Sequence, residues 1–144
     1  MISKERLHAV SIVLINDEGK ILGVSRKHDH TDMGLVGGKV DPEDFIPNVS
    51  NVDSLNVMAA LVRGAIREAK EETGLDIFDL EVIYASNWSN RMQWTFLAKY
   101  SGEIHTDEPH VVKWIDTKTL MQGSFKEYNL EVLASLNEIG INIK

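Results

Sequence analysis

The feature that most constrains this chain is the charged stretch at residues 67–75, which reads Arg-Glu-Ala-Lys-Glu-Glu-Thr-Gly-Leu. It closes an apolar-periodic run, and Gly74 follows it as glycine commonly follows the end of a helix. The spacing therefore predicts a helix that ends at this glycine. At about 100° per residue, Glu68, Glu71 and Glu72 share one face of that helix, because they stand at i, i+3 and i+4.

Three carboxylates on one stripe of a helix have two possible explanations. Like charges at this spacing each destabilise a helix by a few tenths of a kcal/mol, and negative charge near the C-terminus also opposes the macrodipole. A hard divalent cation such as Mg²⁺ would turn the same cluster into a set of ligands. The alternative is a solvated helix face, in which Arg67 and Glu71 form an ordinary i, i+4 ion pair.

The remaining faces of this helix predict how it packs. The helix is expected to begin near Asp53. Gly64 lies one turn before Glu68, where glycine costs about 1 kcal/mol relative to alanine, and we expect it to make room for the segment at residues 37–38. The face next to the carboxylates is apolar and is predicted to contact the core: Met58, Val62, Ala65, Ile66 and Ala69.

Period-2 patterns and turn residues predict the other elements. Strands are expected at residues 8–15, 20–25, 33–40, 80–85, 92–100 and 111–115. The first two are predicted to form a hairpin around the turn at residues 16–19, and the strands at 80–85 and 92–100 to pair antiparallel. A last helix is predicted from about Ser124, as N-cap, to Ile139. A mixed sheet packed between helices is the simplest arrangement of these elements.

Residues 67–75 resemble the second half of the Nudix box, G-x5-E-x7-R-E-U-x-E-E-x-G-U, where U is a bulky apolar residue. All fixed positions of that half are filled, with Ala69 as a small residue at its first U position. Residues 34–40 are similar to the apolar strand and double glycine that open the box. The order of elements outside the box also fits, so the resemblance covers nearly the whole chain.

The chain departs from the family pattern between the two halves of the box. The pattern places its arginine fourteen positions after its first glycine, whereas Arg67 follows Gly38 by 67 − 38 = 29 positions. About fifteen extra residues are therefore expected, as a loop within residues 44–56 that shapes the pocket or mediates dimer contacts. The family's remaining glutamate is implied to brace this loop against the helix, and the candidates for that role are Glu43 and Asp44.

The resemblance implies an α/β/α sandwich with a central mixed sheet, and it implies a metal site. Residue by residue, Glu68 and Glu72 are implied to be direct ligands of Mg²⁺, for which Mn²⁺ is an alternative. Glu71 is implied to share the metal or to bridge to it through water, and the carbonyl of Gly38 to complete the ligands. Arg67 is implied to orient a glutamate.

The activity implied by the resemblance is hydrolysis of a phosphoanhydride in a nucleoside diphosphate linked to another group. ADP-ribose, NADH and dinucleoside polyphosphates are the substrate types expected first. One alternative is a nucleoside triphosphate pyrophosphohydrolase that clears damaged nucleotides, and another is a non-catalytic nucleotide-binding module. The general base is expected to be a glutamate of the box or Glu108 in the loop before the last strand, with Glu103 as a second candidate in that loop.

Three residues are predicted to contact substrate. Arg26, in a polar loop, and Lys39 are candidates for phosphate binding, since a guanidinium fork matches phosphate geometry well. Trp88 is a candidate for stacking on a nucleobase. Met92 and Trp94 are expected to be core or cross-strand partners.

Composition narrows the possible partners and the compartment. With 144 residues, 43% hydrophobic and 26% charged, the chain is predicted to be one domain, 1–144. A net charge of −7 argues against a long nucleic-acid partner, because phosphate backbones require clustered Lys and Arg. The lack of Cys, of a signal peptide and of a long apolar run predicts a cytoplasmic protein without membrane contact. A homodimer is also considered.

Overall fold

A six-stranded mixed sheet forms the centre of the computed structural model, which describes residues 8–41, 44, 54–88 and 91–143. The strand order is β4-β5-β1-β3-β2-β6. β1 and β5 run parallel, and the other neighbouring pairs run antiparallel. The strands are β1 (His8–Val13), β2 (Ile21–Ser25), β3 (Met33–Lys39), β4 (Asp76–Trp88), β5 (Arg91–Ser101) and β6 (Val112–Ile115).

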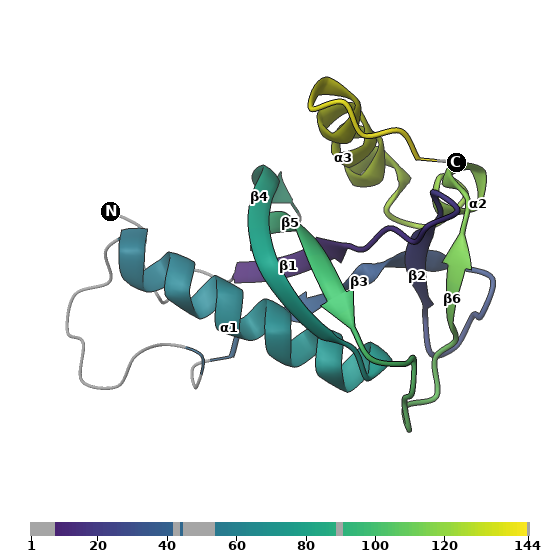
Figure 1. The fold of residues 1–144 in the computed structure, drawn as a ribbon, viewed down its shortest axis with the longest axis horizontal. Coiled ribbons are helices and arrows are strands. Elements are labelled where there is room, and N and C mark those ends of the chain that lie inside the picture. Colours follow the sequence, from purple (N-terminus) through teal and green to yellow (C-terminus); the bar gives the residue numbers. More distant parts are fainter. Residues whose placement is uncertain (1–7, 42–43, 45–53, 89–90, 144) are drawn as a thin grey trace.

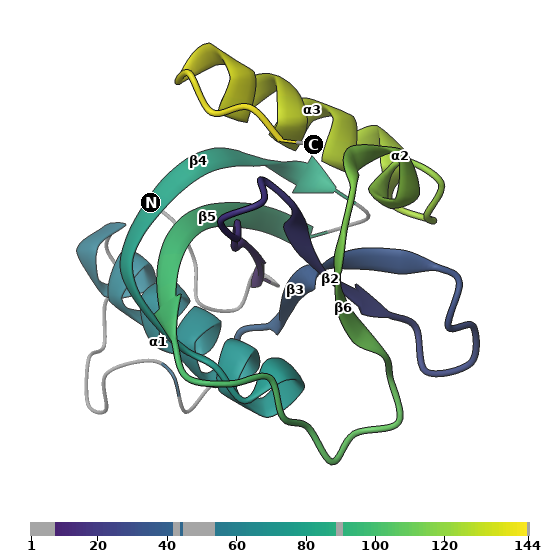
Figure 2. The ribbon, with the colours of Figure 1, turned by 45° about the vertical axis from the view of Figure 1, so that its right-hand side comes forward.

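Helices cover both faces of this sheet. The long helix α1 (Ser54–Thr73) lies across one face, while α2 (Thr117–Leu120) and α3 (Lys126–Glu138) lie on the other (Figures 1 and 2). Each interface has its own apolar cluster, one built around Leu61, Ala65 and Ala69 of α1 and one around Val132 and Leu136 of α3. The predicted α/β/α sandwich with a mixed sheet is confirmed.

Alternation along the central strands separates the two clusters. In β1, Val10 and Ile12 pack in the α1 cluster, whereas Val13 packs in the α3 cluster. Successive side chains of a strand point to opposite faces, so a strand covered on both sides can be apolar throughout. The same alternation in β5 places Trp94 and Phe96 on the α1 side.

The helix α1 ends where the sequence predicts. Gly74 adopts φ +79°, a conformation that favours glycine, and its N–H donates to the carbonyl of Lys70 at 2.9 Å. The predicted core face is wrong at one position, because Ile66 is 40% exposed. The buried stripe follows an i, i+4 row through Ala65 and Ala69, and Ile66 stands about 100° away from that row.

The predicted hairpin between the first two strands does not form. Its turn does: Gly19 has φ +77°, and Ile15 and Ile21 form an isolated antiparallel bridge. Beyond the bridge the strands separate, and β3 pairs antiparallel with both of them. β3 therefore lies beside β1, where the hairpin prediction placed β2.

The antiparallel pairing of β4 with β5 is confirmed, and β4 is longer than predicted. A β-bulge near Asp79, which has φ 52°, interrupts the pairing register. The bulge allows a strand of 13 residues to bend around the sheet (Figure 2).

Two further sequence expectations need correction or lie outside the structure. The predicted N-cap Ser124 is bonded to Asp32 instead, and α3 begins after Phe125 without a side-chain cap. Most of the predicted insertion loop and Asp53 lie outside the described residues, while Ser54 is already helical. Among the helices of the described residues, none is long and apolar enough to cross a membrane.

Candidate active site

The carboxylate of Glu72 lies where α1 meets β3, largely buried. Its Oε1 accepts a hydrogen bond from the N–H of Gly37 at 2.7 Å. Burial raises the pKa of Glu72 to about 8; the Gly37 hydrogen bond opposes the rise, and the charges of Glu68, Glu108 and Glu71 add to it. A positive charge placed beside this group would favour its ionised form.

The neighbouring carboxylate, Glu68, contacts the backbone of Gly38. A Cβ at Gly38 would overlap the carboxylate carbon and both carboxylate oxygens of Glu68. Burial also raises the pKa of Glu68, against the lowering effect of Arg67. A side chain at this position would displace the carboxylate of Glu68, so glycine lets that carboxylate lie against β3.

Arg67 connects the acidic residues to the segment that follows β3. Its guanidinium lies 2.9 Å from Asp44 Oδ2, 3.0 Å from Glu68 Oε1 and 3.4 Å from Glu71 Oε2. It also donates to the carbonyl of Lys39 at 3.2 Å. Arg67 thus orients Glu68 and fixes the end of β3 against the helix.

Asp44 stands where the family pattern, counted from Gly38, has its bracing glutamate. It receives two bonds from Arg67, at 3.2 and 2.9 Å, and its Oδ2 accepts from the N–H of Asp41 at 2.8 Å. Burial raises its pKa, but the bonds from Arg67 and Asp41 outweigh burial, and the net shift is downward. The other predicted candidate, Glu43, lies outside the described residues.

The sequence predicted that Gly64 makes room for residues 37–38, and this neighbour is wrong. A Cβ at Gly64 would lie 3.1 Å from Asp44 Oδ2 and 3.3 Å from Val40 Cγ2, rather than against residues 37–38. Glycine here makes room for the bracing carboxylate. The rise of α1 places position 64 beside the segment after β3, one turn before the level of Gly38.

The loop at residues 102–111 brings another acidic residue to the site by capping the end of α1. The N–H of His105 donates to the carbonyl of Thr73 at 2.7 Å, and Thr106 Oγ1 donates to the carbonyl of Glu71 at 3.3 Å. Helix C-termini leave such carbonyls without partners, and this loop supplies the partners. Glu108 is part of this loop.

His110 joins that loop to the buried glutamate. Its side chain is 2% exposed, and its Nε2 donates to the carbonyl of Glu72 at 2.8 Å. Its Nδ1 lies 3.3 Å from Glu108 Oε2. Glu108 is therefore held near Glu72, whose pKa its charge helps to raise, whereas the second candidate, Glu103, is exposed.

The donor set fits a divalent cation that keeps part of its water shell. Within the described part of the chain, no three His, Asp or Glu side chains converge into a complete ligand cage. Mg²⁺ is usually bound by one or two carboxylates, with waters and substrate phosphates in the other positions. Glu68 and Glu72 supply two such carboxylates, and the missing Cβ of Gly38 lets the carboxylate of Glu68 lie against the backbone of β3.

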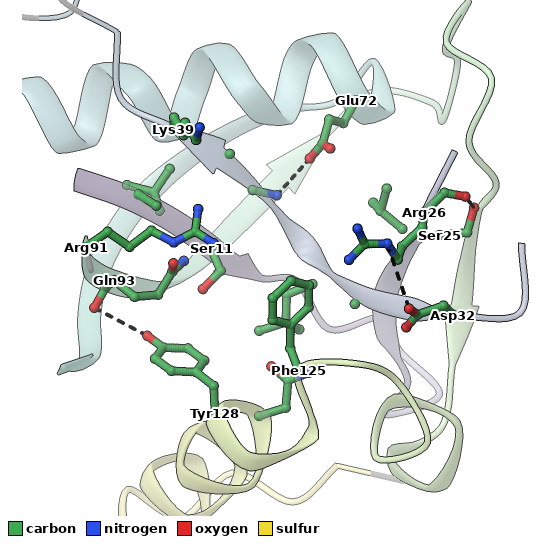
Figure 3. Close-up of a pocket in the computed structure, with 18 residues that line it drawn as sticks. Ser11, Ser25, Arg26, Asp32, Lys39, Glu72, Arg91, Gln93, Phe125 and Tyr128 are labelled. Carbon is green, nitrogen blue, oxygen red and sulfur yellow. Dashed lines mark hydrogen bonds and ion pairs between the residues drawn. The ribbon is translucent and has the colours of Figure 1, made fainter. Parts of the chain in front are cut away.

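A cavity of about 340 Å³ opens from Glu72 across the sheet toward α3 (Figure 3). This volume lies in the range of small-molecule sites. At one end it is lined by Gly37, Gly38 and Glu72. The far end is lined by side chains from β1, β5 and the start of α3: Ser11, Arg91, Gln93, Phe125, Tyr128 and Asn129.

The predicted substrate contacts are distributed unequally over this cavity. Arg26 and Lys39 both line it, and both are exposed; Arg26 forms a long ion pair of 3.9 Å with Asp32. The backbone of Trp88 pairs with Arg91 at the end of the β4–β5 ladder, and its side chain lies outside what the structure describes. Trp94 lies on the α1 side, where its Nε1 donates to His8 Nδ1 at 3.2 Å.

Sequence reasoning missed the far end of the cavity. Arg91 and Gln93 alternate with Met92 and Trp94 along β5, so they occupy the opposite face of the sheet. That alternation was a usable signal, since two polar residues on a covered sheet face require partners. Asn129 gave no comparable signal, because the residues that line the cavity with it, such as Ser11 and Gln93, are far away in sequence.

Comparison with known proteins agrees with this architecture. The NUDIX domain family model matches residues 5–136, while a search of curated proteins finds no match. A MutT structure, from work on Aliivibrio salmonicida and Vibrio cholerae, is 19% identical over 92% of this chain and 98% of its own, with a TM-score of 0.65.

Two other solved structures have the same fold. An ADP-ribose pyrophosphatase from Streptococcus suis is 20% identical over 95% of this chain and 93% of its own, with a TM-score of 0.64. A NUDIX family hydrolase from Clostridium perfringens is 20% identical over 93% of this chain and 98% of its own, with a TM-score of 0.62. At these identities the structures establish the fold, and the family model establishes the family. The chain belongs to the Nudix hydrolase family, as its two box-like segments predicted.

Proposed function

We propose that this Nudix domain hydrolyses a phosphoanhydride in a nucleoside diphosphate linked to another group, and that Mg²⁺ is required. Substrates of the ADP-ribose, NADH and dinucleoside polyphosphate types are the first to test. The observation that carries the proposal is the position of two partly buried carboxylates: Glu72 lines a cavity large enough for a nucleotide, and Glu68 lies one helical turn away. Mn²⁺ is the alternative cation.

The residues around these carboxylates have distinct proposed roles. Glu68 and Glu72 hold the cation together with the carbonyl of Gly38, and Glu71, which is half-exposed, reaches it through water. When bound, such a cation neutralises charge on phosphoryl oxygens and lowers the pKa of a water. Arg67 acts as a positioning residue, because all of its described contacts are to acidic side chains and one carbonyl.

Glu108 is the proposed general base. It accepts a proton from the attacking water as the new P–O bond forms, and the bridging P–O bond breaks to release the second phosphate product. Its loop is anchored on the last carbonyls of α1, which keeps Glu108 near Glu72. Arg26 and Lys39, at the cavity rim, are proposed to contact substrate phosphates, and Trp88 to stack on a base.

A release assay tests this proposal. Phosphate and nucleoside monophosphate release should be measured with Mg²⁺ over a panel of nucleoside diphosphate conjugates, dinucleoside polyphosphates and nucleoside triphosphates. Glu72→Gln should reduce turnover on the order of 10²- to 10³-fold, because it removes a negatively charged ligand of the proposed cation. Glu81→Gln, at an exposed site on β4, is the matched control and should be unchanged.

The outcomes separate three functions. Turnover of the conjugates supports the proposal, while exclusive turnover of triphosphates would assign a pyrophosphohydrolase of another substrate class. Nucleotide binding without turnover of any compound would indicate a non-catalytic binding module. Equal turnover by wild type and Glu72→Gln would reject the assigned site.

A further inference from the structure

The loop that carries Glu108 is held from a second side. This loop, residues 102–111, is called the capping loop because it caps the end of α1. Its other side contacts the end of β2 and the loop that follows β2, residues 26–32. Three hydrogen bonds span this contact: Ser25 N–H to the carbonyl of Val111 at 2.8 Å, Val111 N–H to Ser25 Oγ at 2.8 Å, and His30 Nε2 to the carbonyl of Pro109 at 3.1 Å.

Ser25 forms an irregular pair with Val111. The register of β2 with β6 pairs Val24 with Val112, so Ser25 and Val111 are the next pair along the ladder. In a regular hydrogen-bonded pair of antiparallel strands, each residue donates its N–H to the carbonyl of the other. The N–H of Ser25 does so, whereas the N–H of Val111 donates to the Ser25 hydroxyl. The side chain therefore takes the place of a main-chain acceptor.

The same hydroxyl reaches a residue that the proposed function places at the substrate. Ser25 Oγ donates to the carbonyl of Arg26 at 3.0 Å, and Arg26 is a proposed phosphate contact. Ser25 is 6% exposed, and it lines the cavity beside Arg26 (Figure 3). A hydroxyl has one hydrogen to donate, so a hydroxyl that also accepts a bond is fixed in its rotation. One buried oxygen thus connects the backbone of Arg26 to the backbone of the capping loop.

His30 supports the capping loop directly beside Glu108. Pro109 follows Glu108 and has no N–H, so its carbonyl is its main-chain hydrogen-bonding group. A carbonyl can only accept, so His30 Nε2 donates to it. The loop of His30 is itself closed by Asp29, which accepts from the N–H and the hydroxyl of Thr31 at 2.9 and 2.6 Å. A structured neighbour therefore holds the residue that follows the proposed base.

The position of Glu108 depends on its loop because solvent reaches its side chain. That side chain is 38% exposed, and His110 Nδ1 lies 3.3 Å from its Oε2. A general base must lie within hydrogen-bond distance of the water it deprotonates, and a displacement of about 1 Å can cost on the order of 10²-fold in rate. The backbone of the capping loop therefore has to place the carboxylate.

We propose that Ser25 and His30 are positioning residues that hold Glu108 in place for the attack of water. Each acts through the main chain of the capping loop and contacts no reacting atom. The inference rests on the proposed function, in which Glu108 accepts the proton. It adds that the end of β2 and the loop after it set the position of the base, and that one hydroxyl ties this position to Arg26.

A double-mutant cycle in kcat tests the proposal. Ser25→Ala should lower kcat on the order of 10-fold, and His30→Ala about 3-fold, because the bond of the exposed histidine competes with water. Each loss should nearly vanish in a Glu108→Gln background, since both residues act through that carboxylate. His30→Gln keeps an N–H donor and should restore most of the activity. Ser101→Ala and His28→Ala, at exposed positions, are the matched controls and should equal wild type.

Amide hydrogen exchange tests the same positioning without turnover. The N–H of Val111 donates to the Ser25 hydroxyl, so its exchange should be at least 10-fold faster in Ser25→Ala than in wild type. Amides at the centre of α1 are the internal reference and should keep their exchange rates. An equal acceleration in α1 would show general destabilisation and would reject the positioning role.

Three other results would overturn the inference. They are a kcat of Ser25→Ala within 2-fold of wild type, losses that persist in full in the Glu108→Gln background, and unchanged exchange of the Val111 amide. If wild type hydrolyses no compound, the proposed function fails, and the exchange ratio alone decides whether Ser25 holds the capping loop. If Glu108→Gln keeps full turnover, Glu108 is not the base and the catalytic part of the inference is rejected.

Discussion

One end of the cavity presents carboxylates, and the other presents hydrogen-bond donors. At one end, Glu68 and Glu72 are buried among other carboxylates, and burial raises the pKa of both. At the other end, Arg91 Nε and Asn129 Nδ2 are buried donors without acceptors among the described residues. The first end therefore suits a cation, and the second suits a group that accepts hydrogen bonds.

The two ends also differ in how the chain builds them. At the acidic end, Glu68, Glu71 and Glu72 come from one helix, which contacts the capping loop and β3. The donor end is assembled from β1, β5 and α3, which lie far apart in sequence. The acidic end is thus built mainly on a local element, and the donor end on long-range packing.

The largest effect on turnover is expected for a substitution of the proposed general base, Glu108. Glu108→Gln should lower turnover on the order of 10²-fold or more, because it removes a proton acceptor in the transition state. Single-turnover assays provide the measurement. A loss of only a few-fold would remove Glu108 from the mechanism and would contradict the assignment of the chemistry to the acidic end.

His110→Ala should have a smaller effect at the same end, on the order of 10-fold in turnover. The histidine would act through Glu108, which it contacts at 3.3 Å, so the variant should lose little more activity in a Glu108→Gln background. The double-mutant cycle in kcat provides the measurement. His105→Ala, exposed in the same loop, is the control, and additive losses would show that His110 acts independently.

Loss of the ion pair between Asp44 and Arg67 should affect stability more than turnover. Asp44→Asn should lower the free energy of unfolding by about 2 kcal/mol, a typical value for a hydrogen bond to a charged group. Because the folded-state pKa of Asp44 is lowered, its contribution is present above the unfolded value near pH 4 and is lost as pH falls through the folded pKa.

Urea denaturation at pH 7 and pH 3 measures that contribution. The difference between wild type and Asp44→Asn should shrink at the lower pH, whereas Asp17→Asn, in an exposed turn, should differ little from wild type at either. An equal loss of unfolding free energy at both pH values would show that the charge of Asp44 does not contribute to its contact with Arg67.

The smallest effect is expected at Gly64. Alanine gains about 1 kcal/mol of helix propensity, but its Cβ would lie 3.1 Å from Asp44 Oδ2, so the two contributions should nearly cancel. Thermal unfolding should therefore shift little for Gly64→Ala. Gly64→Leu should lose stability through displacement of Asp44, and a loss of turnover at unchanged stability would contradict this assignment.

The sequence predicted what depends on local spacing. The helix, its end at Gly74 and the shared face of three glutamates all follow from the 3.6-residue period and the properties of glycine. The matched box segments predicted the family, and the order of strands and helices predicted the layers. The distance in sequence between Gly38 and Arg67 did not obscure the match.

The errors concern partners that are far apart in sequence. The turn at Gly19 forms, but β3 displaces the expected strand pair, a choice that turn residues cannot specify. Gly64 faces Asp44 because α1 passes that particular segment. Ser124 bonds to Asp32 across the fold instead of capping its own helix. Each of these contacts is decided by tertiary packing.

The most direct test of the central claim is a measurement of cation binding that does not depend on turnover. Free Mn²⁺ can be followed by its paramagnetic resonance signal as it is titrated into wild type, Glu72→Gln and the exposed-site control Glu81→Gln. The assigned site predicts saturable binding by wild type and the control, displaced by Mg²⁺, with at least a 10-fold weaker affinity in Glu72→Gln. Equal affinity in all three proteins would show that the acidic end does not hold the cation.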